Sequence, residues 1–176
     1  EIYRIGRDGS GLTRVTNNSI EDRQPDWSPD GATLVVSAPD AGGKFQLFSI
    51  NVADGSNRTQ ITTLPGDSSN PSYSPLGDQI AFQNCIGLQP GISCQIVVRT
   101  VLSGATFFIP NDGWSDEQPE WVNPTPSDEF LIISSKSPEP GDTYHLYVMN
   151  MLGYLQWQIT QDDALTDRDP SCCLSP

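Results

Sequence analysis

The chain contains one histidine, His145, so any catalysis that needs an imidazole base has to use this residue. A serine hydrolase needs such a base beside its nucleophile, and the sequence has no Gly-x-Ser-x-Gly turn to present a serine. A glycine-rich phosphate loop and a His-Glu-x-x-His zinc motif are also missing from the sequence. His145 aligns with Glu1, Gln46 and Gln95, a polar column that we interpret as a solvent-facing strand position. We therefore expect no catalytic site.

Carboxylates gather in two places, and oxygen-rich loops of this kind can hold calcium through six to eight ligands. The two groups are Asp112, Asp116, Glu117 and Glu120, and Asp162, Asp163, Asp167 and Asp169. Neither group has the Asp-x-Asp-x-Asp-Gly spacing of a specific calcium loop. The second group is the calcium candidate, a solvated acidic surface is the alternative, and no other cofactor is expected.

The four cysteines favour an oxidising compartment. Cys85 ends one predicted strand and Cys94 begins the next, so an antiparallel pair brings them together and predicts a disulfide. Cys172 and Cys173 are adjacent, which leaves a strained vicinal bond or pairing with cysteines elsewhere. A zinc site is the alternative for all four, but no Cys-x-x-Cys pair exists. We expect a secreted or periplasmic protein.

Three further residues are surface candidates. Asn17 and Asn57 begin Asn-x-Ser/Thr acceptors for glycosylation, which we expect to be exposed. Trp114 lies outside the regular aromatic positions of the chain. It is either a contact for a partner or a sugar ring, or a tryptophan that packs a loop.

These residues are distributed around a motif that occurs four times, Pro-x-aromatic followed by a second proline. Its first prolines are 46, 48 and 51 residues apart, a period typical of propeller blades. The aromatic position holds tryptophan, tyrosine, tryptophan and then cysteine. The four copies are built on Asp22, Pro25 and Trp27; Ser68, Pro71 and Tyr73; Asp116, Pro119 and Trp121; and Asp167, Pro170 and Cys172.

Each interval between motifs predicts four short strands with turns between them. The third strands align as 2–3, 47–48, 96–97 and 146–147, and the fourth as 15–16, 61–62, 109–110 and 159–160. Asp-Gly pairs at 8–9 and 54–55 predict hairpin turns, because glycine takes a positive φ without steric cost. No segment has a helical period. The fold class is all-β, a β-propeller of four-stranded antiparallel blades.

The repeat resembles the Asp-x-x-Pro-x-Trp-Ser-Pro-Asp-Gly repeat of TolB-like β-propellers, which is WD40-like and also occurs in peptidase propellers. The first copy matches fully through Asp30 and Gly31, and the other three depart from it. The resemblance implies that the aspartate and the aromatic residue of each repeat are structural. It also implies protein partners at the propeller face or its central channel. A linker carboxylate at Asp22, Asp116 or Asp167 can accept backbone N–H bonds that would otherwise stay unsatisfied.

One propeller domain or segment is expected over residues 1–176, with repeats at about 1–24, 25–70, 71–118, 119–169 and 170–176, the first and last partial. The predicted strands number fifteen, one fewer than a closed four-bladed ring needs. Three explanations stay open: a segment of a longer propeller, a ring with a defective blade, or a subunit whose gap is filled by a neighbour.

The chain is acidic, with a net charge of −13 and a pI near 4.1. Its nine Lys and Arg residues are scattered, which argues against nucleic acid, and no apolar run is long enough for membrane insertion. We predict a non-catalytic, exported interaction scaffold with protein partners. The alternatives are a subunit of an extracellular fibre, assembled by strand complementation, and a fragment of a peptidase gating propeller.

Overall fold

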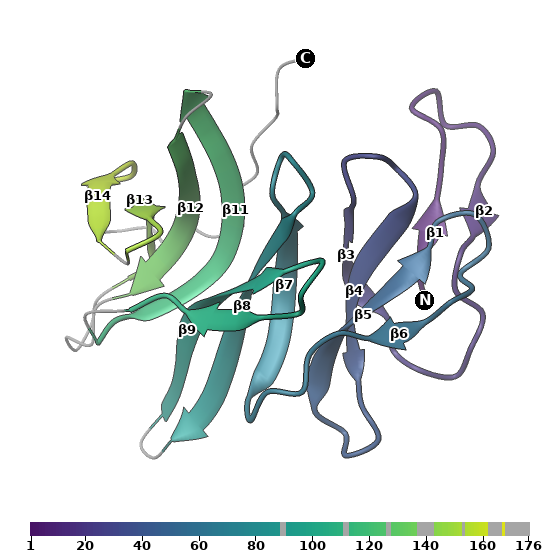
Figure 1. Cartoon of the computed structure of the whole chain (residues 1–176), viewed down its shortest axis with the longest axis horizontal. Helices are drawn as coiled ribbons and strands as arrows, with labels where there is room; N and C mark the ends of the chain where they lie inside the picture. The colour runs from purple at the N-terminus through teal and green to yellow at the C-terminus, as the bar shows by residue number, and fades with distance from the viewer. Residues whose placement is uncertain are drawn as a thin grey trace.

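The computed structural model describes residues 1–88, 91–110, 113–125, 128–136, 143–152, 154–161 and 167. These residues form one two-stranded sheet and three four-stranded sheets, all antiparallel, which lie side by side in chain order (Figure 1). The all-β fold with four-stranded blades is therefore confirmed. The strands are β1 Tyr3–Arg4, β2 Thr13–Arg14, β3 Arg23–Trp27, β4 Thr33–Pro39, β5 Phe45–Asn51, β6 Thr59–Gln60, β7 Asp67–Tyr73, β8 Gln79–Leu88, β9 Gly91–Thr100, β10 Thr106–Phe108, β11 Ser115–Thr125, β12 Asp128–Lys136, β13 His145–Asn150 and β14 Leu155–Gln158.

Each four-stranded sheet is a simple meander in which consecutive strands are neighbours. Strands β3, β7 and β11 are the first of their sheets, and β7 contacts both of the others, so the three form the inner wall shared by the blades. The fifteenth strand that the sequence predicts would begin at Pro170, which lies outside the described residues.

The fourth strand of each sheet ends earlier than the sequence predicts. The predicted apolar pairs follow strands β2, β6, β10 and β14 directly. They still hold the ladder, because the first residue of each pair donates its N–H to β5, β9 or β13, or, in the two-stranded sheet, to Ile2 directly before β1. The four equivalent bonds run from Val15 N to Ile2 O, Ile61 N to Leu47 O, Ile109 N to Ile96 O and Ile159 N to Leu146 O, at 2.7–2.9 Å.

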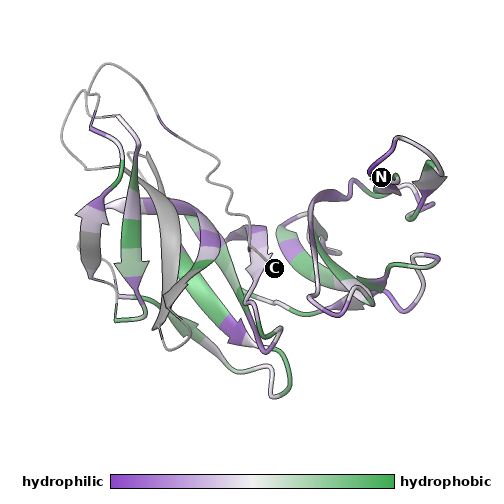
Figure 2. Ribbon diagram, turned by 90° about the horizontal axis from the view of Figure 1, so that it is seen from above, coloured by the Kyte–Doolittle hydropathy of each residue, from purple (hydrophilic) through white to green (hydrophobic). Residues whose placement is uncertain are grey.

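The core lies between the sheets. In β4, Leu34 and Val36 pack against Ile2 of the two-stranded sheet, while Val35 packs with Phe82 of the next blade. Both faces of this strand are therefore covered, which explains its unbroken apolar run. Figure 2 shows the hydrophobic residues on the strands of the blades and the hydrophilic ones mainly toward their ends.

A bulge interrupts each inner strand just before its proline. The residues in front of these prolines, Gln24, Asn70 and Gln118, have positive φ values of 51°, 49° and 52°. The strand registers shift at the same points. A proline disfavours the right-handed helical region for the residue before it, and the left-handed region is uncommon outside glycine. Three repeats thus share one unusual backbone conformation.

The two predicted Asp-Gly turns contain glycines in the left-handed region, with φ of 82° at Gly9 and 68° at Gly55. A Cβ on Gly55 would lie 2.1 Å from the carbonyl oxygen of Val15, whereas a Cβ on Gly9 would meet nothing within 4 Å. Gly55 is therefore also the place where the second sheet closely approaches the first.

Candidate binding cleft

A polar cleft of about 510 Å³ opens where the inner strands begin and the β8–β9 hairpin ends. It is lined by residues from all three four-stranded sheets, which the fold alone brings together. These residues, which we call the inner-strand cleft, are Arg23, Gln24, Phe45, Asp67, Ser69, Gln83, Cys85, Cys94, Glu117 and Tyr144.

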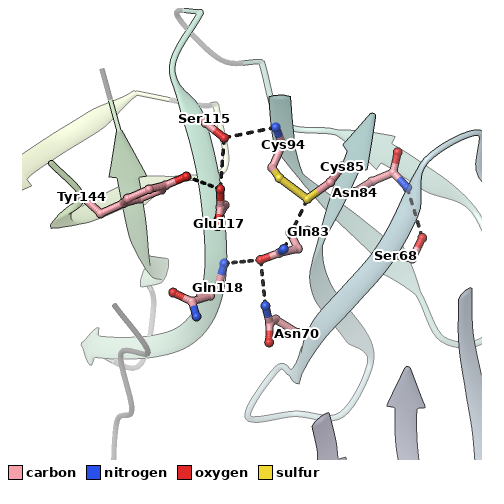
Figure 3. The surroundings of a disulfide bond; sticks show 10 residues. All are labelled: Ser68, Asn70, Gln83, Asn84, Cys85, Cys94, Ser115, Glu117, Gln118 and Tyr144. Atoms are coloured by element: carbon pink, nitrogen blue, oxygen red, sulfur yellow. Dashed lines mark hydrogen bonds between the residues drawn. A yellow bond between two sulfur atoms is a disulfide. The ribbon is translucent and has the colours of Figure 1, made fainter. Parts of the chain in front are cut away.

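A row of amide side chains connects the blades along this cleft. Gln24 Nε2 donates to Asn70 Oδ1, and Asn70 N donates back to Gln24 Oε1 at 3.3 Å. Gln83 Oε1 then accepts both Asn70 Nδ2, at 2.9 Å, and Gln118 N, at 2.8 Å (Figure 3). The bulges hold three of these residues at the inner wall, and the hydrogen bonds stabilise the unusual backbone there.

The predicted disulfide between Cys85 and Cys94 is present, on directly paired residues of β8 and β9. It lies in the cleft wall beside Gln83, whose Nε2 is 3.3 Å from Cys85 Sγ. Cys94 N donates to Ser115 Oγ at 3.2 Å, which connects the disulfide hairpin to β11 of the next blade. The bridge therefore fixes one side of the cleft (Figure 3).

The two acids of the cleft have partners within the protein. Asp67 Oδ1 accepts Phe45 N at 2.9 Å. Glu117 Oε1 accepts the hydroxyls of Tyr144 and Ser115. The Asp67 bond joins two neighbouring blades, the Glu117 bonds lie within one blade, and together they hold both carboxylates in place.

A second repeated contact joins the inner strands of neighbouring blades. The side chain between proline and the aromatic residue accepts the N–H of the next blade's aromatic residue: Asp26 Oδ2 from Tyr73 N at 2.7 Å, and Ser72 Oγ from Trp121 N at 3.4 Å. Trp121 Nε1 also donates to Ser72 O at 3.0 Å. Burial raises the pKa of Asp26 and also that of Tyr73.

The leading residue of the motif is buried in the three copies whose inner strand is described, at Asp22, Ser68 and Asp116, whereas Asp167 of the fourth copy is half-buried. The expected backbone N–H donors are not the partners of Asp22. Its carboxylate accepts Asn18 Nδ2 at 3.1 Å and lies 2.7 Å from Arg58 Nη1. A buried carboxylate needs a cation or a hydrogen-bond donor beside it, and here the side chains of Arg58 and Asn18 supply both.

The solvent-facing interpretation of the His145 column is wrong, because both His145 and Gln46 are buried. The column faces the segment that leaves the fourth strand. Gln46 makes four hydrogen bonds to that segment, with Thr62, Leu64 and Gly66. His145 Nε2 lies 3.2 Å from the Thr143 hydroxyl, and its Nδ1 lies 3.9 Å from Asp167 Oδ2.

Glu1 occupies the same column in the first sheet. Hydrogen bonds from the Thr16 hydroxyl and Asn18 N–H, together with Arg14, lower the pKa of its carboxyl to about 2. Thr16 and Thr62 are equivalent residues, since each also accepts the N–H of a third-strand residue at 2.8 Å. The column is therefore a repeated anchor for the connection to the next blade.

The aromatic candidates differ in burial. Trp114 is half-buried and packs edge-on against Tyr147, with ring centroids 5.7 Å apart, so it packs a loop. Trp121 is buried, whereas Trp27 is 48% exposed. Among the described strands, no inner strand of a preceding blade lies against β3, whereas β7 precedes β11 and its Ser72 bonds to Trp121, which explains why Trp27 is the more exposed. Asn17 and Asn57 are exposed, and their glycosylation stays a prediction.

The calcium candidate falls largely outside the described residues, at Asp162, Asp163 and Asp169, as do Asp112, Pro170 and the Cys172–Cys173 pair. Asp167 is described, and its N–H donates to Tyr144 O at 2.8 Å. Within the described ranges, no three His, Cys, Asp or Glu residues are placed to hold a metal ion. Calcium binding remains a prediction. The same ranges contain no helix with the length and hydrophobicity required to cross a membrane.

Sequence reasoning missed the amide row. Its signal was nevertheless present, because Gln24, Asn70 and Gln118 give Gln-Pro, Asn-Pro and Gln-Pro at the same repeat position. Gln83 lies in a strand and has no such signal. Its role follows only from the pairing of β8 with β7 and the contact of both with β11.

Comparison with known proteins connects this architecture to a named group. No family model matches the chain. The Tol-Pal system protein TolB of Francisella tularensis is 38% identical over 71 residues, 40% of this chain. Dipeptidyl-peptidase 5 of Porphyromonas endodontalis is 29% identical over 82 residues, 47% of this chain. The matched regions span only 15% and 12% of these two relatives.

Solved structures support the same assignment of the fold. A putative TolB from Agrobacterium tumefaciens superposes with a TM-score of 0.70 at 22% identity, over 88% of this chain and 54% of that one. The tricorn protease superposes with a TM-score of 0.59 at 15% identity, over 82% of this chain and 15% of that one. The repeated inner strands, the four-stranded sheets and these similarities agree: the chain has a TolB-like β-propeller fold.

Proposed function

We propose that the protein is a non-catalytic, exported propeller that binds a protein partner through the inner-strand cleft. The observation that carries the proposal is the cleft itself, where amides, hydroxyls and the Phe45 ring from three blades line one opening. Amide groups both donate and accept, so such a wall suits the backbone of a peptide segment. The similarity to TolB, a protein of the Tol-Pal system, supports a partner that is itself a protein.

The composition of the cleft supports binding rather than catalysis. A general acid and base need titratable groups that are available to a substrate. Asp67 and Glu117 instead accept hydrogen bonds from the protein, and His145 is not among the residues that line the cleft. Export is supported by the Cys85–Cys94 disulfide, which persists in oxidising compartments, and the similarity to TolB favours the periplasm.

The test is to select peptides on the protein and to ask where they bind. Twelve-residue peptides are selected by phage display and then titrated against the wild type and two variants. Ser69→Trp fills the cleft, because Ser69 lines it. Ser103→Trp places the same ring on an exposed turn at the opposite end of the β9 strand.

Ser69→Trp should lower the affinity for the selected peptides by at least about tenfold, because a ring in the cleft excludes the ligand. Ser103→Trp should leave that affinity unchanged. Equal affinities for both variants would place the peptides elsewhere and refute the proposed site. Thermal unfolding of both variants verifies that they are folded.

A peptidase-associated propeller is the second candidate, favoured by the similarity to dipeptidyl-peptidase 5 and to the tricorn protease. In that case the chain would control access to a hydrolase domain. Sequencing the complete gene decides the matter, because a downstream Gly-x-Ser-x-Gly motif would support this candidate.

A fibre subunit is the third candidate. Among the described residues, β1 pairs only with β2, and Tyr3, Ile5 and Leu12 beside them are exposed. An open strand edge can receive a strand from another molecule. Light scattering that shows a monomeric particle would eliminate this candidate.

A further inference from the structure

Among the described residues that line the cleft, Arg23 is the only cation. Its guanidinium carbon lies 3.6 Å from the centroid of the Phe45 ring, so one face of the group is fixed against an aromatic side chain. Its Nε lies 3.7 Å from Glu21 Oε1, and both side chains are substantially exposed. A pair of this kind is weak in water, so the N–H edge of Arg23 is available to a stronger acceptor.

Arg23 makes no ion pair with either acid that lines the described part of the cleft. Asp67 accepts Phe45 N, and Glu117 accepts the Tyr144 and Ser115 hydroxyls. The guanidinium edge of Arg23 is therefore the charged donor that the described part of the cleft offers to a ligand, although the chain as a whole carries a net charge of −13.

Gln83 adds a second donor with a fixed orientation. Its oxygen accepts Asn70 Nδ2 and Gln118 N, so its amide nitrogen must face the disulfide (Figure 3). There its partner is Cys85 Sγ at 3.3 Å, and sulfur is a weak acceptor. The side chain is 7% exposed and lines the cleft, so an oxygen of a ligand would be a better partner than the sulfur.

We propose that the partner segment carries a carboxylate that pairs with Arg23, while Gln83 Nε2 donates to a carbonyl of the same peptide. This inference rests on the proposed function and specifies the chemistry of the partner. A guanidinium binds a carboxylate through two parallel N–H bonds, and its stacking on Phe45 holds it in the orientation required. The carboxylate belongs either to an Asp or Glu side chain or to the end of a chain.

The test uses four fluorescent peptide pools of equal length whose variable positions are neutral. Three are amidated and have Asp, Asn or Lys at the centre, and the fourth has Asn at the centre and a free C-terminal carboxylate. Binding to the protein is measured by fluorescence polarisation. The variants are Arg23→Gln, the conservative Arg23→Lys, and Arg7→Gln, which removes the same charge from an exposed turn.

The Asp pool or the free-acid pool should bind about tenfold more tightly than the amidated Asn pool, and the better of the two identifies the source of the carboxylate. Arg23→Gln should abolish this preference, Arg23→Lys should restore part of it, and Arg7→Gln should retain all of it. Binding without a preference for a carboxylate, or a preference for Lys, overturns the inference and leaves the proposed function standing. If no pool binds, both fall.

Discussion

Replacing Gln46 with leucine should strongly destabilise the protein, although leucine fits the same space. The side chain is fully buried and makes four hydrogen bonds, from Nε2 to Leu64 O and Gly66 O and to Oε1 from Leu64 N and the Thr62 hydroxyl. A neutral hydrogen bond contributes about 0.5–1.5 kcal/mol net, and a buried group left without a partner costs about 1–3 kcal/mol. Leucine transfers from water to the protein interior more favourably than glutamine, which offsets part of this loss. We therefore expect the free energy of unfolding to fall by about 3 kcal/mol.

Chemical and thermal unfolding followed by circular dichroism measure the effect. A change of 1 kcal/mol shifts the Tm of a protein of this size by about 2–4 °C, so Gln46→Leu should lower the Tm by about 6–12 °C. The matched control is Gln95→Leu, at the equivalent position of the next blade. In that blade Pro110 takes the place of Thr62, and Gln95 makes no side-chain hydrogen bond in the described part of the chain. If the two variants lose equal stability, the anchoring role of the column is refuted.

Three further changes test the fold and its electrostatics. Replacing both Cys85 and Cys94 with serine should lower the free energy of unfolding by about 2–3 kcal/mol, as measured with urea, and added reductant should then have no further effect on these residues. Asp26→Asn keeps an acceptor but removes a half-buried charge. The folded-state pKa of Asp26 is raised, so its protonated form stabilises the protein fully below pH 3.8, and this stabilisation is lost as the pH rises through the folded-state pKa. The Tm of the variant should therefore rise relative to that of the wild type over this pH interval, which a series of Tm measurements checks. Gly55→Ala should destabilise the protein far more than Gly9→Ala, which adds only the left-handed backbone penalty of about 1–2 kcal/mol; equal Tm losses would contradict the close approach to the first sheet.

The repeat motif was sufficient to predict the blades, because prolines and turn glycines punctuate the chain at intervals that strands must fill. The disulfide was predictable for the same reason, since pairing of consecutive strands places Cys85 opposite Cys94. These features depend on local order along the chain. The succession of strands and turns along the chain is what a single sequence predicts best.

The cleft depends on contacts between blades, and the sequence alone did not reveal it. The burial of His145 and Gln46 was misjudged because a column of polar residues on a strand usually faces water. Here the connection that follows the fourth strand folds back over the column and satisfies the polar groups of Glu1 and Gln46. The side-chain partners of Asp22 were missed for a similar reason, because Arg58 is distant in the sequence.

The bond between neighbouring inner strands has a consequence for how such a protein can evolve. In the bonds from Tyr73 N to Asp26 and from Trp121 N to Ser72, the donor is a main-chain group that every residue except proline possesses. Only the accepting side chain has to be selected, and an aspartate and a serine both serve. A duplicated blade would thus find its partner already present in whichever blade precedes it. Unequal recombination between repeats could lengthen or shorten the ring without a matching second mutation.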